Sequence, residues 1–320
     1  GFLEKRDKIV IGSRGSKLAL IQANWVKSQL EKDNKEIEFT IEIIKTTGDK
    51  ITDVPLSKIG SIGLFTKELE DALLDKKIDL VVHSAKDMAT EIPDGLEIGA
   101  ITKREDPRDA LISKGNKSLK DLPQNAKLGT SSLRRKAQVL AYRPDLEILD
   151  LRGNLDTRLQ KLETGDLDAI LVAMAGLTRL GCADKATEVI PYDIMLPAVG
   201  QGALCIEIRE NDEQIKDLLK VVLHYDTRFA VMAERVLLHR LQGGCQIPVG
   251  AHAEIIFPVN IKMEAVVCSL DGKTVIRDSV VGKVDDYSVM GLDLANKLLG
   301  RGGRQILEDI RANLAEEQVN

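Results

Sequence analysis

The sequence predicts an α/β fold with mostly parallel sheets, followed by a smaller α+β region that carries an antiparallel sheet. Short runs of Ile, Val and Leu recur along the chain, each followed by a polar turn and then by a segment with helical periodicity. These runs are almost continuously apolar, which is typical of strands that are buried on both faces of a sheet. From about residue 224 the pattern changes to longer extended segments joined by short turns.

The predicted strands of the first part are spaced along the chain with helices between them. The first strand, Ile9–Ile11, leads through Gly12 and Ser13 into an amphipathic helix. The same order of strand, Gly-Ser or Gly-Thr turn, serine and helix recurs at 127–132, which is consistent with two lobes of similar architecture. Further strands are predicted at Ile41–Ile44, Leu80–Val82, Ala110–Ile112, Ile148–Leu151 and Ala169–Ala173.

The last part begins with a predicted helix from Arg228 to Leu241. Extended segments follow at residues 251–257, 261–270 and 273–282, and Asp271-Gly272 supplies a strong hairpin signal between the last two. Two helical stretches complete the chain. We therefore expect a small α+β domain with an antiparallel sheet.

Composition limits the classes of partner. The 320 residues are enough for two or three domains, and 43% hydrophobic with 30% charged residues is ordinary for a globular protein. Lys and Arg number 45 against 50 Asp and Glu, so no global positive field exists for nucleic acid or an anionic membrane. No apolar run reaches the ~20 residues that span a bilayer, and no signal-peptide core is present at the start. These features favour a cytoplasmic or stromal protein and leave open a removed transit peptide.

Hydroxyl and basic residues follow five of the predicted strands, at the strand ends where α/β sheets bind ligands. They are Ser13, Arg14 and Ser16; His83, Ser84, Lys86 and Asp87; Thr130, Ser131, Ser132, Arg134 and Arg135; Arg152, Asn154 and Arg158; and Arg179. Such groups bind carboxylates or phosphates. Because no phosphate-binding glycine pattern occurs at these ends, we expect carboxylates. A salt bridge or a solvated surface position explains any single arginine equally well.

Asp87 and Cys245 differ from these anion-binding residues. An acid is not needed to bind an anion, so Asp87 is predicted to carry out proton chemistry, or else to cap a helix or pair with Lys86. Cys245 follows two glycines in a loop and is a tether, a nucleophile or a residue without a role. Cys205 and Cys268 lie in apolar segments and are expected to be inert core residues. The four cysteines form no C-x-x-C pair, so neither disulfides nor a zinc site is expected.

Nine segments occur in an order that resembles the porphobilinogen deaminase family over about residues 9 to 315. They are Gly12–Leu20, Lys45–Asp49, Gly63–Phe65, His83–Asp87, Arg104–Ala110, Gly129–Arg135, Arg152–Asn154, Leu196–Ala203 and Gly243–Gln246. Any one of them could arise by coincidence, but the ordered set is highly specific.

The resemblance implies three domains. Domain 1 is expected at 9–102 with 200–222, domain 2 at 103–199 and domain 3 at 223–320. The first two resemble type II periplasmic-binding-protein lobes, with the active site in the cleft between them. The third domain is α+β and carries Cys245.

The resemblance also implies the activity, that of a transferase in tetrapyrrole and heme biosynthesis. Such enzymes join four porphobilinogen units head to tail with loss of ammonia and release hydroxymethylbilane. A dipyrromethane cofactor, attached to Cys245 through a thioether, primes the chain. The expected protein is a cytoplasmic monomer that binds no metal, nucleic acid or membrane.

Individual roles follow by the same resemblance. Residues implied to bind the cofactor are Cys245, Ser16, Ser84, Lys86, Asp87, Thr130, Ser132, Arg134 and Arg135. Residues implied to bind substrate or the growing chain are Arg14, Gln22, Phe65, Arg152, Arg158, Arg179 and Gln201. Asp87 is the implied catalytic residue, which assists the departure of ammonia and stabilises a cationic azafulvene intermediate.

Two departures from the family pattern accompany the resemblance. Ile62 stands where the family commonly has a lysine, so a cation is missing from the glycine-rich segment 45–63, which is either a mobile lid or an ordinary loop. Met88-Ala89 replaces a hydrophobic residue followed by proline after Asp87. The main alternative function is a non-enzymatic two-lobed receptor for a polycarboxylate, which needs no tethered thiol. A phosphoryl transferase is disfavoured because no phosphate loop is present.

Overall fold

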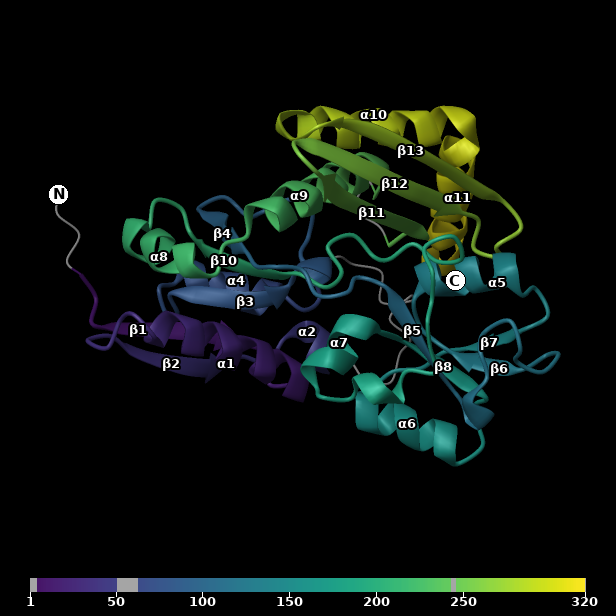
Figure 1. The fold of residues 1–320 in the computed structure, drawn as a ribbon, viewed down its shortest axis with the longest axis horizontal. Helices are drawn as coiled ribbons and strands as arrows, with labels where there is room; N and C mark the ends of the chain where they lie inside the picture. Colours follow the sequence, from purple (N-terminus) through teal and green to yellow (C-terminus); the bar gives the residue numbers. More distant parts are fainter. Residues whose placement is uncertain (1–4, 51–62, 243–245, 320) are drawn as a thin grey trace. The chain divides into compact units, whose positions relative to one another are not determined.

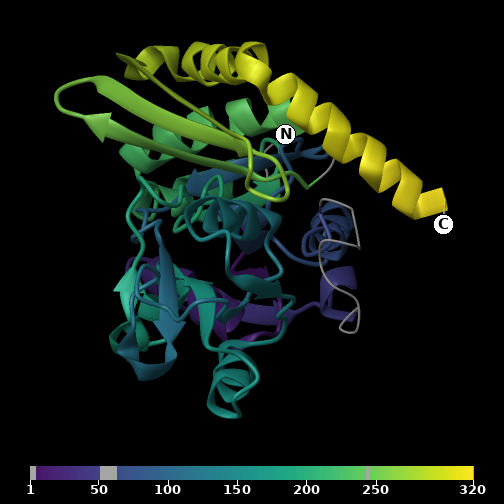
Figure 2. The ribbon, with the colours of Figure 1, turned by 90° about the vertical axis from the view of Figure 1, so that its right-hand side faces the viewer.

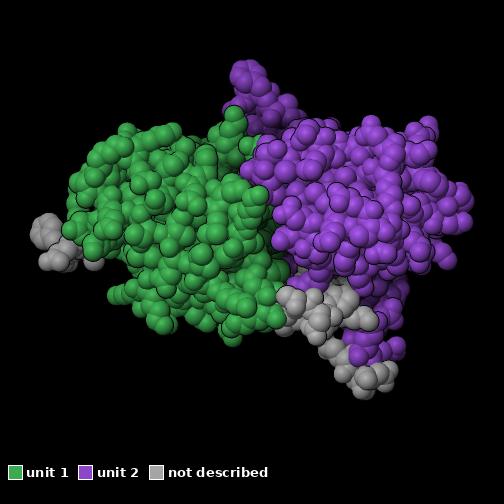
Figure 3. Space-filling model, turned by 90° about the horizontal axis from the view of Figure 1, so that it is seen from below, with its two compact units in different colours: residues 1–51, 63–105, 202–228 green, residues 52–62, 106–201, 229–320 purple. Residues whose placement is uncertain are grey.

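The computed structural model describes residues 5–50, 63–242 and 246–319, and Figure 1 shows its helices and strands. The chain divides into two compact units, which Figure 3 distinguishes by colour. The first unit contains residues 1–51, 63–105 and 202–228, and the second contains 52–62, 106–201 and 229–320. Each unit is therefore assembled from segments that are discontinuous in sequence.

The first unit is built on a five-stranded sheet in the order β2-β1-β3-β10-β4. Strand β1 pairs in parallel with β2 and β3, whereas β10 is antiparallel to both β3 and β4. Four of the five strands therefore run in one direction. The strands are β1 (Lys8–Ser13), β2 (Glu38–Ile43), β3 (Leu80–Ser84), β4 (Leu96–Ile101) and β10 (Leu204–Arg209).

Helices cover both faces of this sheet. Helix α1 (Lys17–Glu31) turns Ala23, Val26 and Leu30 toward one face, where they join a cluster with Ile9 and Ile11. Helix α4 (Lys67–Leu74) packs on the opposite face in a cluster that contains Val81. Burial of both faces explains why the strands are nearly continuous apolar runs. The remaining helices here are α2 (Thr47–Lys50) and α8 (Glu213–Leu218), and α9 (Tyr225–Gln242) begins in this unit.

The second unit contains a sheet with the same plan, in the order β7-β6-β8-β5-β9. Strand β6 is parallel to β7 and β8, and β5 is antiparallel to β8 and β9. The strands are β5 (Asp109–Ser113), β6 (Lys127–Gly129), β7 (Glu147–Leu149), β8 (Ala169–Ala173) and β9 (Glu188–Val189). The helices are α5 (Leu133–Tyr142), α6 (Leu155–Glu163) and α7 (Met174–Arg179).

The repeat that the sequence indicated is present in both sheets. Strands β1 and β6 occupy the same position in the strand order, and each leads into a helix that starts at a serine N-cap. The Ser16 hydroxyl accepts the backbone N–H of Ala19 at 3.2 Å, and the Ser132 hydroxyl accepts that of Arg135 at 3.1 Å. Both serines thus satisfy an N–H group that a helix start leaves without a partner.

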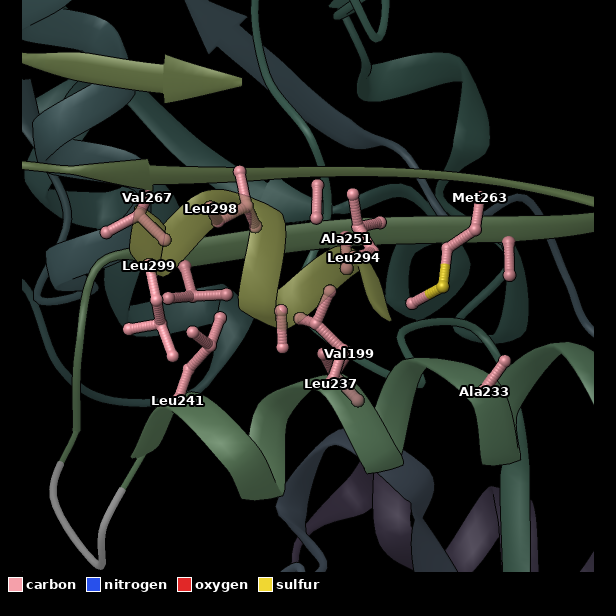
Figure 4. Packing of buried hydrophobic residues seen from close by; sticks show 14 of the residues in the cluster. Val199, Ala233, Leu237, Leu241, Ala251, Met263, Val267, Leu294, Leu298 and Leu299 are labelled. Carbon is pink, nitrogen blue, oxygen red and sulfur yellow. The ribbon is translucent and has the colours of Figure 1, made fainter. Parts of the chain in front are cut away.

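A third, antiparallel sheet lies in the second unit, with strands β11 (Val249–Ile256), β12 (Asn260–Cys268) and β13 (Val275–Lys283). Gly272 has a φ of +73° in the predicted hairpin turn. Side chains of α9, α10 (Tyr287–Leu298) and α11 (Arg304–Val319) form one core with β11 and β12, part of which Figure 4 shows. Figure 2 shows that α10 and α11 follow one another with a bend between them, where Gly302 has a φ of +120°.

The predicted fold class is confirmed, because two mostly parallel sheets and a smaller antiparallel sheet are present. The extended segments and the α9 helix lie within a few residues of their predicted positions. Strands β4 and β9 are not among the predicted strands, since Gly99 interrupts the apolar run of β4 and β9 has only two residues. Among the described residues, no helix is both long and apolar enough to cross a lipid bilayer.

Candidate functional site

Arg14, just after β1, contacts both an acid and an aromatic ring of the first unit. Its guanidinium binds the Asp49 carboxylate through Nε at 3.2 Å to each oxygen and lies 4.1 Å from the centre of the Phe65 ring. Thr46 also donates to Asp49 from its hydroxyl at 2.8 Å. Burial alone raises the pKa of Asp49, but the hydrogen bonds from Arg14 and Thr46 outweigh it and hold the pKa below its ordinary value. Arg14 and Phe65, both predicted site residues, are thus brought together.

The predicted catalytic residue lies on a tight turn at the end of β3. Ala85–Asp87 forms a 3₁₀ turn whose N-cap position is Ser84, so Asp87 is not itself a helix N-cap. The backbone N–H of Ala85 donates to the Ala203 carbonyl at 2.9 Å, which fastens the turn to the start of β10. The Ser84 hydroxyl lies 3.4 Å from the side-chain amide of buried Gln22 on α1. Asp87 is half-buried and Lys86 is exposed.

Behind this turn lies a buried polar cluster of which the sequence analysis identified His83 but neither acid. Nε2 of His83 is 2.9 Å from Oε1 of Glu207, and both side chains are almost fully buried. Burial lowers the pKa of His83 to about 4, so the ring is neutral near pH 7 and donates from Nε2 to the carboxylate. Burial, with a hydrogen bond to Glu207 and the charge of that residue, raises the pKa of Glu70 to about 8. Glu207 is an isolated acid in the apolar run of β10, and this is the sequence signal that could have revealed the cluster.

The second unit contains a buried ionic network around Asp109, the first residue of β5. The Asp109 carboxylate contacts Arg134 at 2.7 Å and Arg135 at 2.8 Å, and Gln201 donates to it at 3.0 Å. Arg134 also donates to the Leu196 carbonyl at 2.9 Å. Burial alone raises the pKa of Asp109, but the two guanidinium groups lower it far below its ordinary range. Three predicted site residues are therefore gathered by an acid that was not predicted.

The network distributes charge unequally, because one buried carboxylate faces two guanidinium groups. The guanidinium of Arg134 donates hydrogen bonds to Asp109, to the Leu196 carbonyl and to Gln201. The pKa of Arg135 is lowered, chiefly by burial and also by Arg134, although Asp109 acts in the opposite direction. Burial therefore outweighs the attraction of Asp109 in its effect on the pKa of Arg135.

Two further predicted arginines extend this positive region. Arg158 on α6 is half-buried, and burial together with the charges of Arg135 and Arg152 lowers its pKa to about 10. Its Nε donates to the Gly153 carbonyl at 2.9 Å, which is a neutral partner. We call Arg135, Arg152 and Arg158 the cationic cluster. Guanidinium groups bind carboxylates in bidentate fashion, so the chemistry of this cluster suits an anion with several acidic groups.

The other predicted residues of the second unit lie near turns and helix ends. Thr130 is buried just after β6, and its hydroxyl accepts the backbone N–H of Ser132 at 3.2 Å. A hydroxyl that accepts a hydrogen bond keeps its own hydrogen to donate, so Thr130, Ser132 and likewise Ser16 can still bind a carboxylate. Arg179 is half-buried in the last turn of α7.

Cys245 and Ile62 lie outside the described residues. Cys205 and Cys268 are buried as predicted, and burial raises the pKa of Cys268 to about 12, which makes it a poor nucleophile. Within the described ranges, no group of three or more His, Cys, Asp or Glu side chains could hold a metal ion.

Comparison with known proteins places these features in a family. Residues 9–217 match the model of the porphobilinogen deaminase dipyromethane cofactor binding domain, and residues 228–300 match the porphobilinogen deaminase C-terminal domain. The chain belongs to the porphobilinogen deaminase family. A porphobilinogen deaminase from Desulforamulus reducens is 52% identical over 96% of this chain and 99% of that protein. One from Chlorobaculum tepidum is 49% identical over 96% and 99%.

Family membership favours the enzyme over the polycarboxylate receptor that the sequence left as an alternative. Solved structures with a similar arrangement include a nutrient binding protein from Burkholderia cenocepacia bound to methionine. It is 15% identical, with a TM-score of 0.43, over 67% of this chain and 91% of that one.

Proposed function

We propose that this chain joins four porphobilinogen units head to tail, releases one ammonia per unit, and yields hydroxymethylbilane. The observation that carries this proposal is the cationic cluster, in a chain whose net charge is −5. Each porphobilinogen ring has an acetate and a propionate, so a growing chain brings many carboxylates to one protein. A partly buried set of arginines that repel one another suits that ligand.

The cations divide into two roles. Arg134 donates its hydrogen bonds to Asp109, the Leu196 carbonyl and Gln201. It therefore holds the start of α5 in place. Arg135 and Arg152 both act on Arg158 and lower its pKa, and these three arginines are proposed to bind carboxylates of the cofactor and the chain. Arg14, Gln22, Phe65, Arg179 and Gln201 are proposed to bind substrate, directly or by holding these groups.

Asp87 is proposed to be the catalytic residue. Ammonia leaves as positive charge develops on the pyrrole, and a fixed carboxylate stabilises that charge in a partly dehydrated site. The turn that carries Asp87 is short, and the backbone N–H of Ala85 within it donates to the Ala203 carbonyl. A carboxylate on such a turn is already oriented before the substrate binds, so little reorganisation is needed in each cycle.

The dipyrromethane cofactor fits the residues present. Its carboxylate side chains match the cationic cluster, and Ser16, Thr130 and Ser132 retain hydroxyl hydrogens to donate. Ser84 and Lys86 are proposed to contribute from the β3 turn. We propose that Cys245 holds the cofactor through a thioether. When bound, the cofactor supplies the nucleophilic pyrrole carbon to which the first substrate unit is joined.

The proposal includes the organisation of the chain. The three separate sheets support three domains, at 9–102 with 200–222, 103–199 and 223–320. We also propose that the protein acts as a cytoplasmic monomer without nucleic acid or membrane partners.

Intact-protein mass spectrometry with localisation of any adduct in tryptic peptides tests the proposal. The native chain is expected to carry a dipyrrole adduct on the peptide that contains Cys245. The C245S variant is expected to lack the adduct and remain folded, whereas the C182S control keeps it. An unmodified native chain, or a normal adduct on C245S, would contradict the proposal and favour the receptor alternative.

A further inference from the structure

A buried acid pair with a histidine, outside the binding residues named above, lies in the first unit. Glu70 on α4, His83 on β3 and Glu207 on β10 have exposed fractions of 8%, 4% and 0%. In the antiparallel pairing of β3 with β10, His83 lies opposite Cys205 and Glu207 lies opposite Val81. Opposed residues, and those two apart on one strand, share a face of a sheet, so His83 and Glu207 point to the same side.

Helix α4 covers that side. Its Leu69 and Leu73 pack with Val81 in one hydrophobic cluster, and Glu70 lies beside them on the helix. Glu207 acts on Glu70 and raises its pKa, so the two carboxyl groups lie close to each other. Two buried carboxyl groups this close favour one proton between them, because two carboxylates repel each other and can only accept hydrogen bonds.

The charge of the cluster follows from this geometry. His83 is neutral near pH 7 and Glu70 is protonated there, since its pKa is raised to about 8. One negative charge therefore remains on the pair of Glu70 and Glu207, whose side chains are both buried. Burying such a charge is costly, and apolar residues of similar size would fill the space at lower cost. The acid is therefore more than packing material.

The position of this charge connects it to the catalytic turn. His83 immediately precedes the Ser84–Asp87 turn. Asp87 and Arg14 both exert charge effects on His83 that are large enough to influence its pKa. The charged and titratable groups that face Glu207 and His83 are thus Glu70 from α4, Asp87 from the turn and Arg14 from the segment after β1.

We propose that Glu207 is a positioning residue for Asp87. Through its hydrogen bond to His83 it fixes the end of β3, from which the Ser84–Asp87 turn starts. Its buried negative charge adds to the potential with which Asp87 stabilises a cation. Glu70 holds the proton that keeps the cluster at one negative charge. This inference rests on the catalytic role proposed for Asp87.

The decisive variant is Glu207→Gln, which keeps the size of the side chain and removes its charge. We expect kcat to fall about tenfold or more, KM to change little, and the adduct mass to remain. Hydrogen exchange of the backbone at residues 83–88 should become faster than in the wild type. The control is Glu213→Gln. The Glu213 side chain is 76% exposed in the same unit, and its substitution should change neither kcat nor the hydrogen exchange of residues 83–88.

A double-mutant cycle separates positioning from general stability. If Glu207 acts through Asp87, the Glu207→Gln change should lower single-turnover rates by less than about twofold in an Asp87→Asn background. An equal fold-loss in both backgrounds would overturn the proposal. So would wild-type kcat and exchange in a folded Glu207→Gln protein.

The Glu70→Gln variant provides a test that does not require Glu207→Gln to fold. Above about pH 8 Glu70 loses its proton, and two like charges then repel each other behind the end of β3. This repulsion should loosen the turn that carries Asp87, so kcat should decline there. Gln cannot ionise, and the decline should disappear; an unchanged alkaline limb would overturn the proposal. If the wild type makes no hydroxymethylbilane, the proposed function fails instead, and the hydrogen-exchange comparison still tests whether Glu207 holds the turn.

Discussion

The two five-stranded sheets have the same strand order, yet they accommodate a buried acid in opposite ways. In the first, the strand that runs against its neighbours is β10, and its Glu207 is accompanied by Glu70, which holds a proton, and by neutral His83. In the second, the corresponding strand is β5, and its Asp109 is accompanied by Arg134 and Arg135. One topology therefore supports a cluster that responds to pH near neutrality and another that remains ionised until strongly acid conditions.

The largest expected effect comes from removing the acid of the second sheet. Asp109→Asn leaves two buried guanidinium groups without a counter-charge, and we expect the free energy of unfolding to fall by about 3 kcal/mol or more. Urea unfolding followed by circular dichroism measures it. The Asp121→Asn control changes an exposed acid in the same unit, which accepts only from Ser118, and should have little effect. An equally small effect of Asp109→Asn would contradict the assigned role of the network.

The next largest effect is expected at the cationic cluster, and it distinguishes Arg158 from Arg134, which is bound to Asp109. Arg158→Ala removes a repelled charge, so stability should be kept while turnover falls about 100-fold. Elongation should stop at one discrete chain length, visible by mass spectrometry. Lys161→Ala on the exposed side of α6 is the matched control and should leave elongation normal. If every addition step slowed uniformly in Arg158→Ala, its role in holding the chain would be wrong.

A smaller effect is the pH dependence of stability in the first unit. The neutral form of His83 is favoured on folding, so its contribution is lost as pH falls from 6.5 through about 4. Protonated Glu70 is favoured on folding, so its contribution is fully present below pH 4.5 and is lost as pH rises from there through about 8. Because His83 acts in the opposite direction below pH 6.5, the Tm of thermal unfolding should fall by about 2–4 °C between pH 6.5 and pH 8 and change little above that. That loss should be absent in Glu70→Gln and present in Glu213→Gln.

The smallest effect is expected at the Arg14–Asp49 pair, which is partly exposed. Asp49→Asn should cost about 1 kcal/mol or less at pH 7, because Arg14 keeps its contact with Phe65. The lowered pKa of Asp49 means that its contribution is lost as pH falls below the ordinary 3.8. Urea unfolding at pH 7 and pH 3 measures both, with Asp33→Asn as an exposed control. A cost as large as that of Asp109→Asn would remove the distinction between a half-buried and a fully buried ion pair.

The architecture could be predicted largely because apolar runs report burial directly. The segments around Ile9, Leu80 and Ala169 became strands because sheets covered on both faces exclude polar residues there. The strand order could not be predicted, since nothing local in β5 or β10 shows that it runs against its neighbours. The Asp271-Gly272 turn was predictable because only a few residues accept a positive φ readily.

The candidate site was predicted only in part, for a physical reason. Strand ends indicate which hydroxyls and cations can reach a ligand, and they identified Arg14, Arg135 and Arg158. They do not indicate which cations are already neutralised by distant acids, as Arg134 is by Asp109, 25 residues earlier. Long-range pairing of buried charges follows from the fold, so Glu70, Glu207 and Asp109 emerged only from the structure.

The place of β10 has a consequence for the order of events during synthesis. It lies between β3 and β4, and β4 joins the first sheet only through it. Residues 80–101 are therefore made more than 100 residues before the strand that unites them. The amino-terminal lobe cannot be completed on the ribosome until the segment that forms the sheet of the second lobe has emerged. Domains commonly fold in order from the amino terminus. Here the sheet of the first lobe is completed only after all strands of the second lobe's five-stranded sheet have been synthesised.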